Sequence, residues 1–363
     1  MSTTSTPSTI PDRMKAWSYN HRGPVHKVLQ LSSLPTPRLP QDSPNILVRI
    51  THASLTPSIA HLMPLLPFLR SSRPFIPELS FTGTIAAATP TTPPHLSTPG
   101  TRVFGIIPIS AQLLHGAGAL AEYVVTTPTS VGVCPADLAP EDAAGLDGNG
   151  QTALLMCRNA NVRAGSRVFV NGATGGVGTV VVQVAKRVFG AAEVVATGSG
   201  EEGFALAKAM GADRVVDYRE CGPGGITAWL AEEYGKGGDE GKFDVVLDCV
   251  GTQALFESSP EYLKEEGVFV SVGAMEGVFT TLFWNLPKNR WWPKMLGGTP
   301  RKFIFQQTPI TPERREELVK LVQEGNLKRV VDSVFDMEDA LKAYDRLLSQ
   351  RAKGKVIVKI QDV

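Results

Sequence analysis

One glycine-rich segment constrains the fold of this chain more than any other feature. Residues 168–178 read Val-Phe-Val-Asn-Gly-Ala-Thr-Gly-Gly-Val-Gly, and an apolar helical pattern follows them. Glycines at this spacing fit a strand that turns sharply into a helix, because they permit the bend and let the backbone approach a ligand closely. The N-terminus of that helix would offer free N–H groups to a pyrophosphate. The segment therefore predicts a dinucleotide-binding turn, with contacts from Gly172, Thr174, Gly175, Gly176, Val177 and Gly178.

Short apolar runs and helical patterns alternate around this turn. The strand-like runs are 168–170, 194–197, 214–218, 243–251 and 268–273. Short apolar strands separated by helices indicate a parallel sheet that helices cover on both faces, which is the doubly wound α/β arrangement. The run 302–306 is expected to be the last strand of this sheet. Helices are then expected at 312–324 and 337–348, before a closing strand at 355–360.

The carboxyl end of the second strand bears on the choice of nicotinamide dinucleotide. NAD-specific sites place an acid there for the ribose hydroxyls, and that acid would repel the 2′-phosphate of NADPH. Here Gly198 and Ser199 carry no charge, and the hydroxyl of Tyr218, after the next strand, can donate a hydrogen bond. These residues predict NADPH. The adjacent pair Glu201 and Glu202 argues the other way, because acids near the phosphate would cost affinity.

Two later strand ends are expected to reach the same nucleotide. Val250 and Gly251 follow one apolar run, and Val272 and Gly273 follow the next. In open α/β sheets the ligand lies outside the carboxyl ends of the strands. We therefore include these four residues among the predicted cofactor contacts.

The first third of the chain has a different pattern. Proline and glycine interrupt it every few residues, and short β-rich runs lie between them at 46–50, 82–86, 101–107 and 121–125. This pattern is typical of a small irregular β-domain. A chain of 363 residues is longer than most single cores, so two domains are expected.

Composition excludes several classes of protein. With 36 Lys and Arg against 35 Asp and Glu, the formal charge is +1, which argues against a nucleic-acid partner and against a disordered chain. Apolar runs stop at charged residues before reaching the length of a membrane helix, so no membrane partner is expected. The Ser/Thr-rich start resembles neither a secretion signal nor a transit peptide, and a cytoplasmic protein is expected.

Three further motifs accompany the glycine-rich turn: AKAMGADRVVDY at 207–218, DVVLDCVG at 244–251 and GALAEYV at 118–124. Together they resemble the zinc-independent quinone oxidoreductase branch of the medium-chain dehydrogenase/reductase superfamily, which includes fungal enoyl reductases. The resemblance implies a GroES-like β-domain formed by residues 1–143 and 309–363, with a Rossmann domain of residues 144–308 inserted into it. It also implies a homodimer joined through the edge strand at 302–306, since an apolar edge would otherwise expose unpaired backbone groups.

No metal is expected. The four cysteines are far apart and form no Cys-x-x-Cys pair, and none of the six histidines is spaced with a cysteine or an acid as a ligand set. The Gly-His-Glu element of the zinc-dependent relatives is missing from the sequence.

The resemblance implies hydride transfer from NADPH to a small-molecule substrate, either a quinone or an α,β-unsaturated carbonyl compound. The element at 54–58 resembles the branch's Ser-x-Asn-Pro, but Thr56 replaces the asparagine, and Ile59 and Ser80 stand where the branch has acids. Thr56 keeps a hydroxyl, so we expect it to donate a hydrogen bond at the reacting oxygen or the cofactor. His61 is the second predicted catalytic residue, as a proton source, although it also suits packing of a first helix.

Two questions stay open at this level. The aromatic tract 279–292 suits a wall for a hydrophobic substrate and equally a filling between domains. The changes at Thr56, Ile59 and Ser80 also suit a paralogue that binds the cofactor as a scaffold or redox sensor without reductase activity.

Overall fold

The computed structural model describes residues 10–66 and 73–362. The chain divides into two compact units. The first comprises residues up to 145 together with 334–344 and 357–363, and the second comprises 146–333 and 345–356. Both expected architectures are present: an antiparallel β-domain and a separate doubly wound α/β domain, which confirms the predicted fold class.

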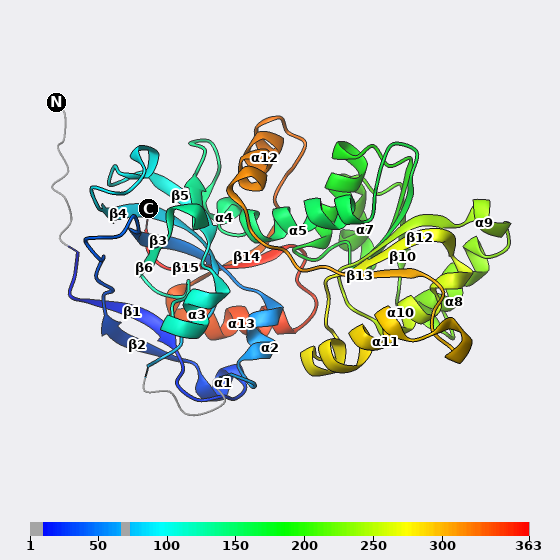
Figure 1. Cartoon of the computed structure of the whole chain (residues 1–363), viewed down its shortest axis with the longest axis horizontal. Helices are drawn as coiled ribbons and strands as arrows, with labels where there is room; N and C mark the ends of the chain where they lie inside the picture. Colours follow the sequence, from blue (N-terminus) through cyan, green and yellow to red (C-terminus); the bar gives the residue numbers. More distant parts are fainter. Residues whose placement is uncertain (1–9, 67–72, 363) are drawn as a thin grey trace. The chain divides into compact units, whose positions relative to one another are not determined.

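The first unit is built on antiparallel strands. Its main sheet has the order β14-β15-β3-β4-β5-β7, with β6 paired to β3, and β1 pairs β2 separately (Figure 1). Its strands are β1 (Arg13–Ser18), β2 (Gln30–Pro35), β3 (Ile46–Ser54), β4 (Ser80–Ala88), β5 (Arg102–Ile106), β6 (Tyr123–Thr126), β7 (Val131–Val133), β14 (Val331–Asp336) and β15 (Lys355–Lys359). Its helices are α1 (Val25–Val28), α2 (Pro57–Leu62), α3 (Ile109–His115) and α4 (Pro140–Ala143). Helix α13 (Ala340–Leu348) begins in this unit, and its residues from Asp345 onward group with the second unit.

The second unit is a six-stranded parallel sheet of order β10-β9-β8-β11-β12-β13. The strands are β8 (Arg167–Asn171), β9 (Glu193–Gly198), β10 (Arg214–Asp217), β11 (Phe243–Asp248), β12 (Leu263–Ser271) and β13 (Lys302–Phe305). Strand order reverses between β8 and β11, and the neighbouring strand ends at such a reversal form the usual crevice for a dinucleotide.

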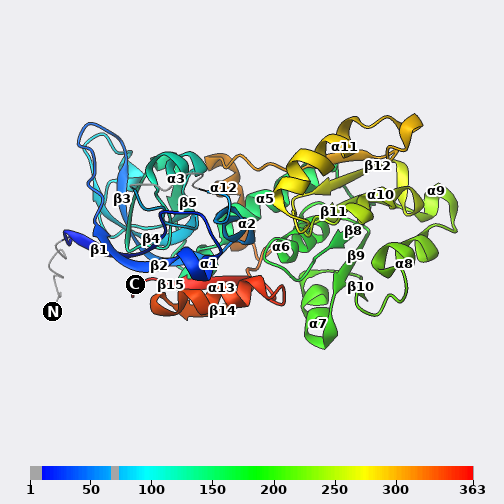
Figure 2. The ribbon, with the colours of Figure 1, turned by 90° about the horizontal axis from the view of Figure 1, so that it is seen from below.

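Helices cover both faces of this sheet (Figure 2). Helices α5 (Leu146–Asn159), α6 (Gly178–Gln183) and α7 (Gly200–Met210) pack beside one another, and α6 continues as a π-helical turn at Val184–Val188. The remaining helices are α8 (Gly225–Tyr234), α9 (Gly238–Gly241), α10 (Gln253–Glu257), α11 (Leu286–Trp291) and α12 (Pro312–Gln323), and a second π-helical turn spans Thr280–Asn285. Strands such as β8, β9 and β11 are buried along most of their length. Successive side chains of a strand point to opposite faces, so the sheet carries a core on each side.

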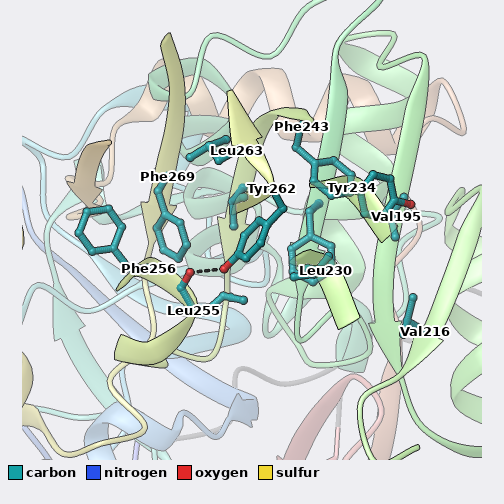
Figure 3. Packing of buried hydrophobic residues seen from close by; sticks show 12 residues of the cluster. Val195, Val216, Leu230, Tyr234, Phe243, Leu255, Phe256, Tyr262, Leu263 and Phe269 are labelled. Atoms are coloured by element: carbon teal, nitrogen blue, oxygen red, sulfur yellow. Dashed lines mark hydrogen bonds between the residues drawn. The ribbon is translucent and has the colours of Figure 1, made fainter. Parts of the chain in front are cut away.

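The core between the sheet and helices α8 and α10 is aromatic (Figure 3). Phe256 and Phe269 meet edge to face with ring centroids 5.3 Å apart, and the buried Tyr262 hydroxyl donates to the carbonyl of Leu255. A buried aromatic side chain contributes about 1.5 to 3 kcal/mol, so this cluster anchors the strands whose ends carry the site.

The sequence analysis expected the chain to return to the first unit at residue 309. In the structure the return comes later in the chain. Residues 309–333 group with the second unit because α12 packs against α5. The Arg315 guanidinium donates to the buried Asp147 carboxylate at 2.8 Å, and Leu318 leaves no room for a side chain at Gly150. Contacts thus assign α12 to the second unit, and Val334 begins the return.

Candidate functional site

The glycine-rich turn closes tightly on itself. Gly172, directly after β8, has a φ of 75°, which favours glycine. A Cβ on Gly178 would lie 2.0 Å from the carbonyl oxygen of Gly172. A Cβ on Gly175, by contrast, would meet its nearest atom at 3.5 Å, an ordinary contact. The turn is therefore shaped by glycines at its first and last positions, as the sequence predicted for close strand–helix packing.

The same turn is lined by a segment from the end of the chain. The backbone N–H of Gly354 donates to the carbonyl of Thr174 at 2.9 Å. A Cβ on Gly176 would lie 2.5 Å from the Cδ of Lys355 and 3.1 Å from the Nδ2 of Asn149. Position 176 thus needs glycine because a buried lysine stem and an amide lie against it.

Side chains link the carboxyl ends of four strands. The hydroxyl of Thr197 on β9 donates to the Oδ1 of Asn171 on β8 at 3.1 Å, and the Asn171 amide donates to Asp248 on β11 at 3.0 Å. Ser271 on β12 donates to the same carboxylate at 3.2 Å. Burial raises the pKa of Asp248, and the donors oppose that rise. This network fixes the strand ends from which the predicted contacts project.

The later strand ends come together beside the turn. A Cβ on Gly172 would lie 2.7 Å from a methyl group of Val250. Gly251 and Gly273 leave no room for side chains on each other, because their Cβ atoms would lie within 2.4 Å of the opposing backbone. The N–H of Val272 donates to the Asp248 carbonyl at 3.0 Å. The structure therefore gathers Gly172, Val250, Gly251, Val272 and Gly273 at the reversal of strand order.

A second part of the site lies at the ends of β9 and β10. Here an open cleft of about 840 Å³ contains the predicted Ser199 and Tyr218, beside Gly200. Gly198 ends β9 at its edge, and half of the Tyr218 surface is exposed. Glu201 and Glu202, the acids that argued against NADPH, line the same cleft. Four cations that the sequence analysis missed also line it: Arg219, Arg346, Arg351 and Lys353. We call this the cation cleft.

Three of these cations are bonded to carboxylates. Asp217 accepts from the Nε and Nη2 of Arg219 at 3.2 and 3.1 Å. The hydrogen bond from Arg219 lowers the pKa of Asp217 to about 2. Arg346 makes two bonds to Asp332 at 2.8 and 2.6 Å, and Lys353 pairs with Glu202. The cation cleft can therefore accept a dianionic group such as a phosphate, which bidentate guanidinium donors suit.

Both predicted catalytic residues lie in the first unit, on α2. Thr56 is the N-cap residue, half-buried, and its carbonyl accepts from the N–H of Ile59 at 3.1 Å. Its side chain makes no capping hydrogen bond, so the hydroxyl is not used in starting the helix. His61 lies in the last turn of the same six-residue helix and is exposed. The structure thus places the two residues at opposite ends of one short helix.

The aromatic tract faces outward. Phe283, Trp284 and Trp291 are each at least 70% exposed, whereas Thr281 and Asn285 of the same helical segment are buried. The Asn285 amide donates to Glu276 at 3.1 Å. This segment precedes β13, the edge strand of the sheet.

Residues 10–66 and 73–362 lack two features that would bear on the site. No group of three or more His, Cys, Asp and Glu side chains there is arranged to hold a metal ion. None of the helices in the same ranges is both long enough and apolar enough to cross a membrane.

Some of the site residues that the sequence analysis missed were visible in the sequence, and others were not. Arg219 directly follows the predicted Tyr218, so a cation there was visible at the strand end. Arg346, Arg351 and Lys353 lie more than 120 residues further along the chain, and only the packing of α13 and its following segment brings them to the cleft. Asp248 was part of a quoted motif, but its role in joining strand ends follows from the strand order.

Comparison with known proteins agrees with this geometry. The model of the family described as "Zinc-binding dehydrogenase" matches residues 176–290. The medium chain reductase pydE of Acremonium sp is 39% identical, with 96% of this chain and 99% of that protein covered. The trans-enoyl reductase poxH of Penicillium oxalicum is 32% identical over the whole of both chains. The quinone oxidoreductase structure from Coxiella burnetii superposes with a TM-score of 0.77 at 25% identity, covering 96% of this chain and all of that one.

These full-length similarities agree with the motifs quoted from the sequence. A glycine-rich turn, a doubly wound sheet and a separate antiparallel domain occur together in one chain. The protein therefore belongs to the medium-chain dehydrogenase/reductase superfamily and is an oxidoreductase similar to enoyl reductases and quinone oxidoreductases.

Proposed function

We propose that this protein is an NADPH-dependent reductase that works without zinc and delivers hydride to a quinone or to an α,β-unsaturated carbonyl compound. The observation that carries the choice of cofactor is the cation cleft, in which four cations face two acids at the end of β9 and β10. The choice of reaction rests on the similarity to a trans-enoyl reductase and a quinone oxidoreductase.

The turn after β8 would hold the pyrophosphate. Gly172 and Gly178 shape it, and Gly175 leaves its middle open, since even an added Cβ would meet nothing closer than 3.5 Å. The backbone N–H groups of Gly176 and Val177 directly precede the helix start at Gly178, where the dipole favours an anion. Val177 and Gly178 continue this turn into α6.

The cation cleft would hold the 2′-phosphate that distinguishes NADPH from NADH. Ser199 and Tyr218 supply hydroxyl donors there, and Arg219, Arg346, Arg351 and Lys353 supply charge. Asp217, the acid nearest the strand end, is already engaged by Arg219 and by the N–H of Gly200 at 3.0 Å. It is therefore held away from the role of a ribose-binding acid, and the cleft favours the phosphorylated nucleotide.

The reduced nicotinamide, when bound, supplies the hydride. The strand ends at Val250, Gly251, Val272 and Gly273 would pack against the nucleotide near the reversal of strand order, and the Asp248 network keeps them in place. Thr56 would donate a hydrogen bond to the oxygen that becomes negatively charged, since its hydroxyl is not used for capping α2. His61 or water would supply the proton.

Two further parts of the proposal concern metal and assembly. The scattered Cys and His residues support a reaction without zinc, and among the described residues none gathers into a ligand group. Turnover should persist with a chelator present; loss of activity with restoration by zinc would contradict this.

The open edge of β13, beside the exposed Phe283, Trp284 and Trp291, supports a homodimer. Light scattering at micromolar concentration should give twice the chain mass, and a monomeric mass would exclude the dimer.

The assay that tests the reaction is acceptor-dependent oxidation of NADPH. Absorbance of NADPH is followed with 1,4-benzoquinone and, separately, with trans-2-hexenal, and the carbonyl product is analysed for loss of the C=C bond. We expect turnover with at least one acceptor. Tight NADPH binding without turnover on either would favour the second candidate, a cofactor-binding paralogue, which the replaced acids at Ile59 and Ser80 keep in view.

A further inference from the structure

The three carboxylates that are bonded to cations of the cation cleft fall into two groups. Asp217 and Asp332 are buried, with side chains only 5% and 4% exposed, whereas the Glu202 side chain is 85% exposed. All three are bonded to a cation of the cleft: Arg219, Arg346 and Lys353 respectively. An entering phosphate would meet carboxylates that differ greatly in how firmly they are held.

The two buried acids, Asp217 and Asp332, hold Arg219 and Arg346 in place through hydrogen bonds. Asp332 accepts from two nitrogens of Arg346 and also from the backbone N–H of Lys353 at 2.7 Å. Asp217 accepts from Arg219 and from the backbone N–H of Gly200. A guanidinium has five N–H donors, so these bonds leave further donors for a ligand. Asp217 and Asp332 therefore position cationic groups and are themselves fixed by backbone donors.

Glu202 is held differently. It lies in the first turn of α7, and its carboxylate is bonded to Lys353, whose side chain is 29% exposed. Lys353 lowers the pKa of Glu202 through this hydrogen bond, so the carboxylate stays charged at neutral pH. An exposed ion pair of this kind is weak, because water competes for both groups and ordering two long side chains costs entropy.

We propose that Glu202 is an internal competitor of the 2′-phosphate: it holds Lys353 while the cleft is free of nucleotide, and it must release that ammonium when the phosphate binds. This inference rests on the proposed function and deepens it by naming a residue that sets the degree of NADPH preference. A phosphate carries about 1.5 to 2 negative charges against one on the carboxylate, so it wins the exchange. The exchange nevertheless costs affinity, and it costs nothing for NADH, which has no group to place there.

Glu201 provides a matched control. It is the adjacent residue, exposed, in the same first turn of α7 and in the lining of the same cleft. Among the residues the structure describes, it has no ion-pair partner, so Glu201→Gln removes the same charge without freeing a cation. A general effect of net charge would act equally at both positions, whereas competition for Lys353 acts only at Glu202.

The experiment measures dissociation constants by calorimetry for adenosine 2′,5′-bisphosphate and for 5′-AMP, two probes that differ by the 2′-phosphate alone. Glu202→Gln should tighten binding of the bisphosphate about fivefold, the upper end for an exposed ion pair, and leave 5′-AMP unchanged. Glu201→Gln should change the bisphosphate constant less than about twofold, and thermal unfolding should show both variants folded.

A double-mutant cycle that combines Glu202→Gln with Lys353→Met tests whether Glu202 acts through Lys353. In that background Glu202→Gln should no longer tighten bisphosphate binding, because there is no ammonium left to release. Equal effects of the two glutamate variants, a persistent gain without Lys353, or weaker binding in Glu202→Gln would each overturn the inference. If the unaltered protein binds 5′-AMP as tightly as the bisphosphate, the proposed preference for NADPH itself fails, which is a separate result.

Discussion

The two ends of the proposed nucleotide site are built in different ways. The turn after β8 is built from backbone: at Gly178 and Gly172 an added Cβ would come within 2.0 and 2.7 Å of neighbouring atoms. The cation cleft at the end of β9 and β10 is built from side chains, several of which are more than one-third exposed. In the first region Gly172, Gly176 and Gly178 leave no room for a side chain, whereas the charged side chains of the second can be replaced one at a time.

This difference separates the binding of dinucleotides in general from the choice between NADH and NADPH. A backbone turn that contacts a pyrophosphate selects dinucleotides in general, because both NADH and NADPH contain that group. In the proposed site, exposed cations paired with carboxylates would select between the two through a single phosphate. Substitutions in the turn should therefore remove binding of both nucleotides or stability itself, and substitutions in the cleft should alter their ratio.

The largest effect is expected at the turn. Gly178→Ala places a Cβ against the Gly172 carbonyl, so the backbone must shift, and we expect a loss of about 3 kcal/mol or more in unfolding free energy. Denaturant unfolding measures it. Gly175→Ala is the matched control, because its Cβ has ordinary contacts, and it should cost less than about 1 kcal/mol. Equal stability losses in the two variants would mean that close packing at Gly178 is not the cause.

The next largest effect concerns Thr56, a side-chain donor in the first unit. Thr56→Val keeps the shape and removes the hydroxyl. Loss of one preorganised donor lowers turnover by about two to three orders of magnitude, roughly 2.7 to 4 kcal/mol. The measurement is turnover at saturating acceptor, with NADPH affinity unchanged as the control. A drop of less than about threefold would make Thr56 structural and leave His61 or water as the remaining candidates.

A smaller effect is expected in the cleft. Arg346→Met removes a guanidinium that Asp332 holds at 2.6 Å, and we expect NADPH to bind about tenfold more weakly with NADH unchanged. Lys236→Met, a similar loss of charge outside the cleft and beside Glu232, should change neither constant. Weaker binding of both nucleotides in Arg346→Met would mean that the cleft does not act through the 2′-phosphate.

The sequence predicted the backbone-built region far better than the side-chain-built one. Glycines at Gly172 and Gly178 act through local geometry, so a short motif between a strand and a helix is enough to place them. The strand at 302–306 and the helix at 312–324 were also visible from local pattern and lie at β13 and α12.

Long-range packing was the part that the sequence could not reveal. Arg346 and Lys353 reach the cleft because the segment after α13 lies against the glycine turn, where Gly354 bonds Thr174. Residues 309–333 group with the second unit because Arg315 pairs with Asp147 across 168 positions of sequence. Neither contact leaves a local signal. Thr56 and His61 also stay predictions, because Thr56 departs from the asparagine of the motif it occupies and His61 belongs to no motif.

The most direct test of the account compares the dissociation constants of NADPH and NADH for the unaltered protein, measured by fluorescence titration at one fixed salt concentration. If the cation cleft binds the 2′-phosphate, NADPH should bind at least about tenfold more tightly, the contribution of one charge-assisted hydrogen-bonding group, and the ratio should shrink as salt rises. Equal or tighter binding of NADH would contradict the account.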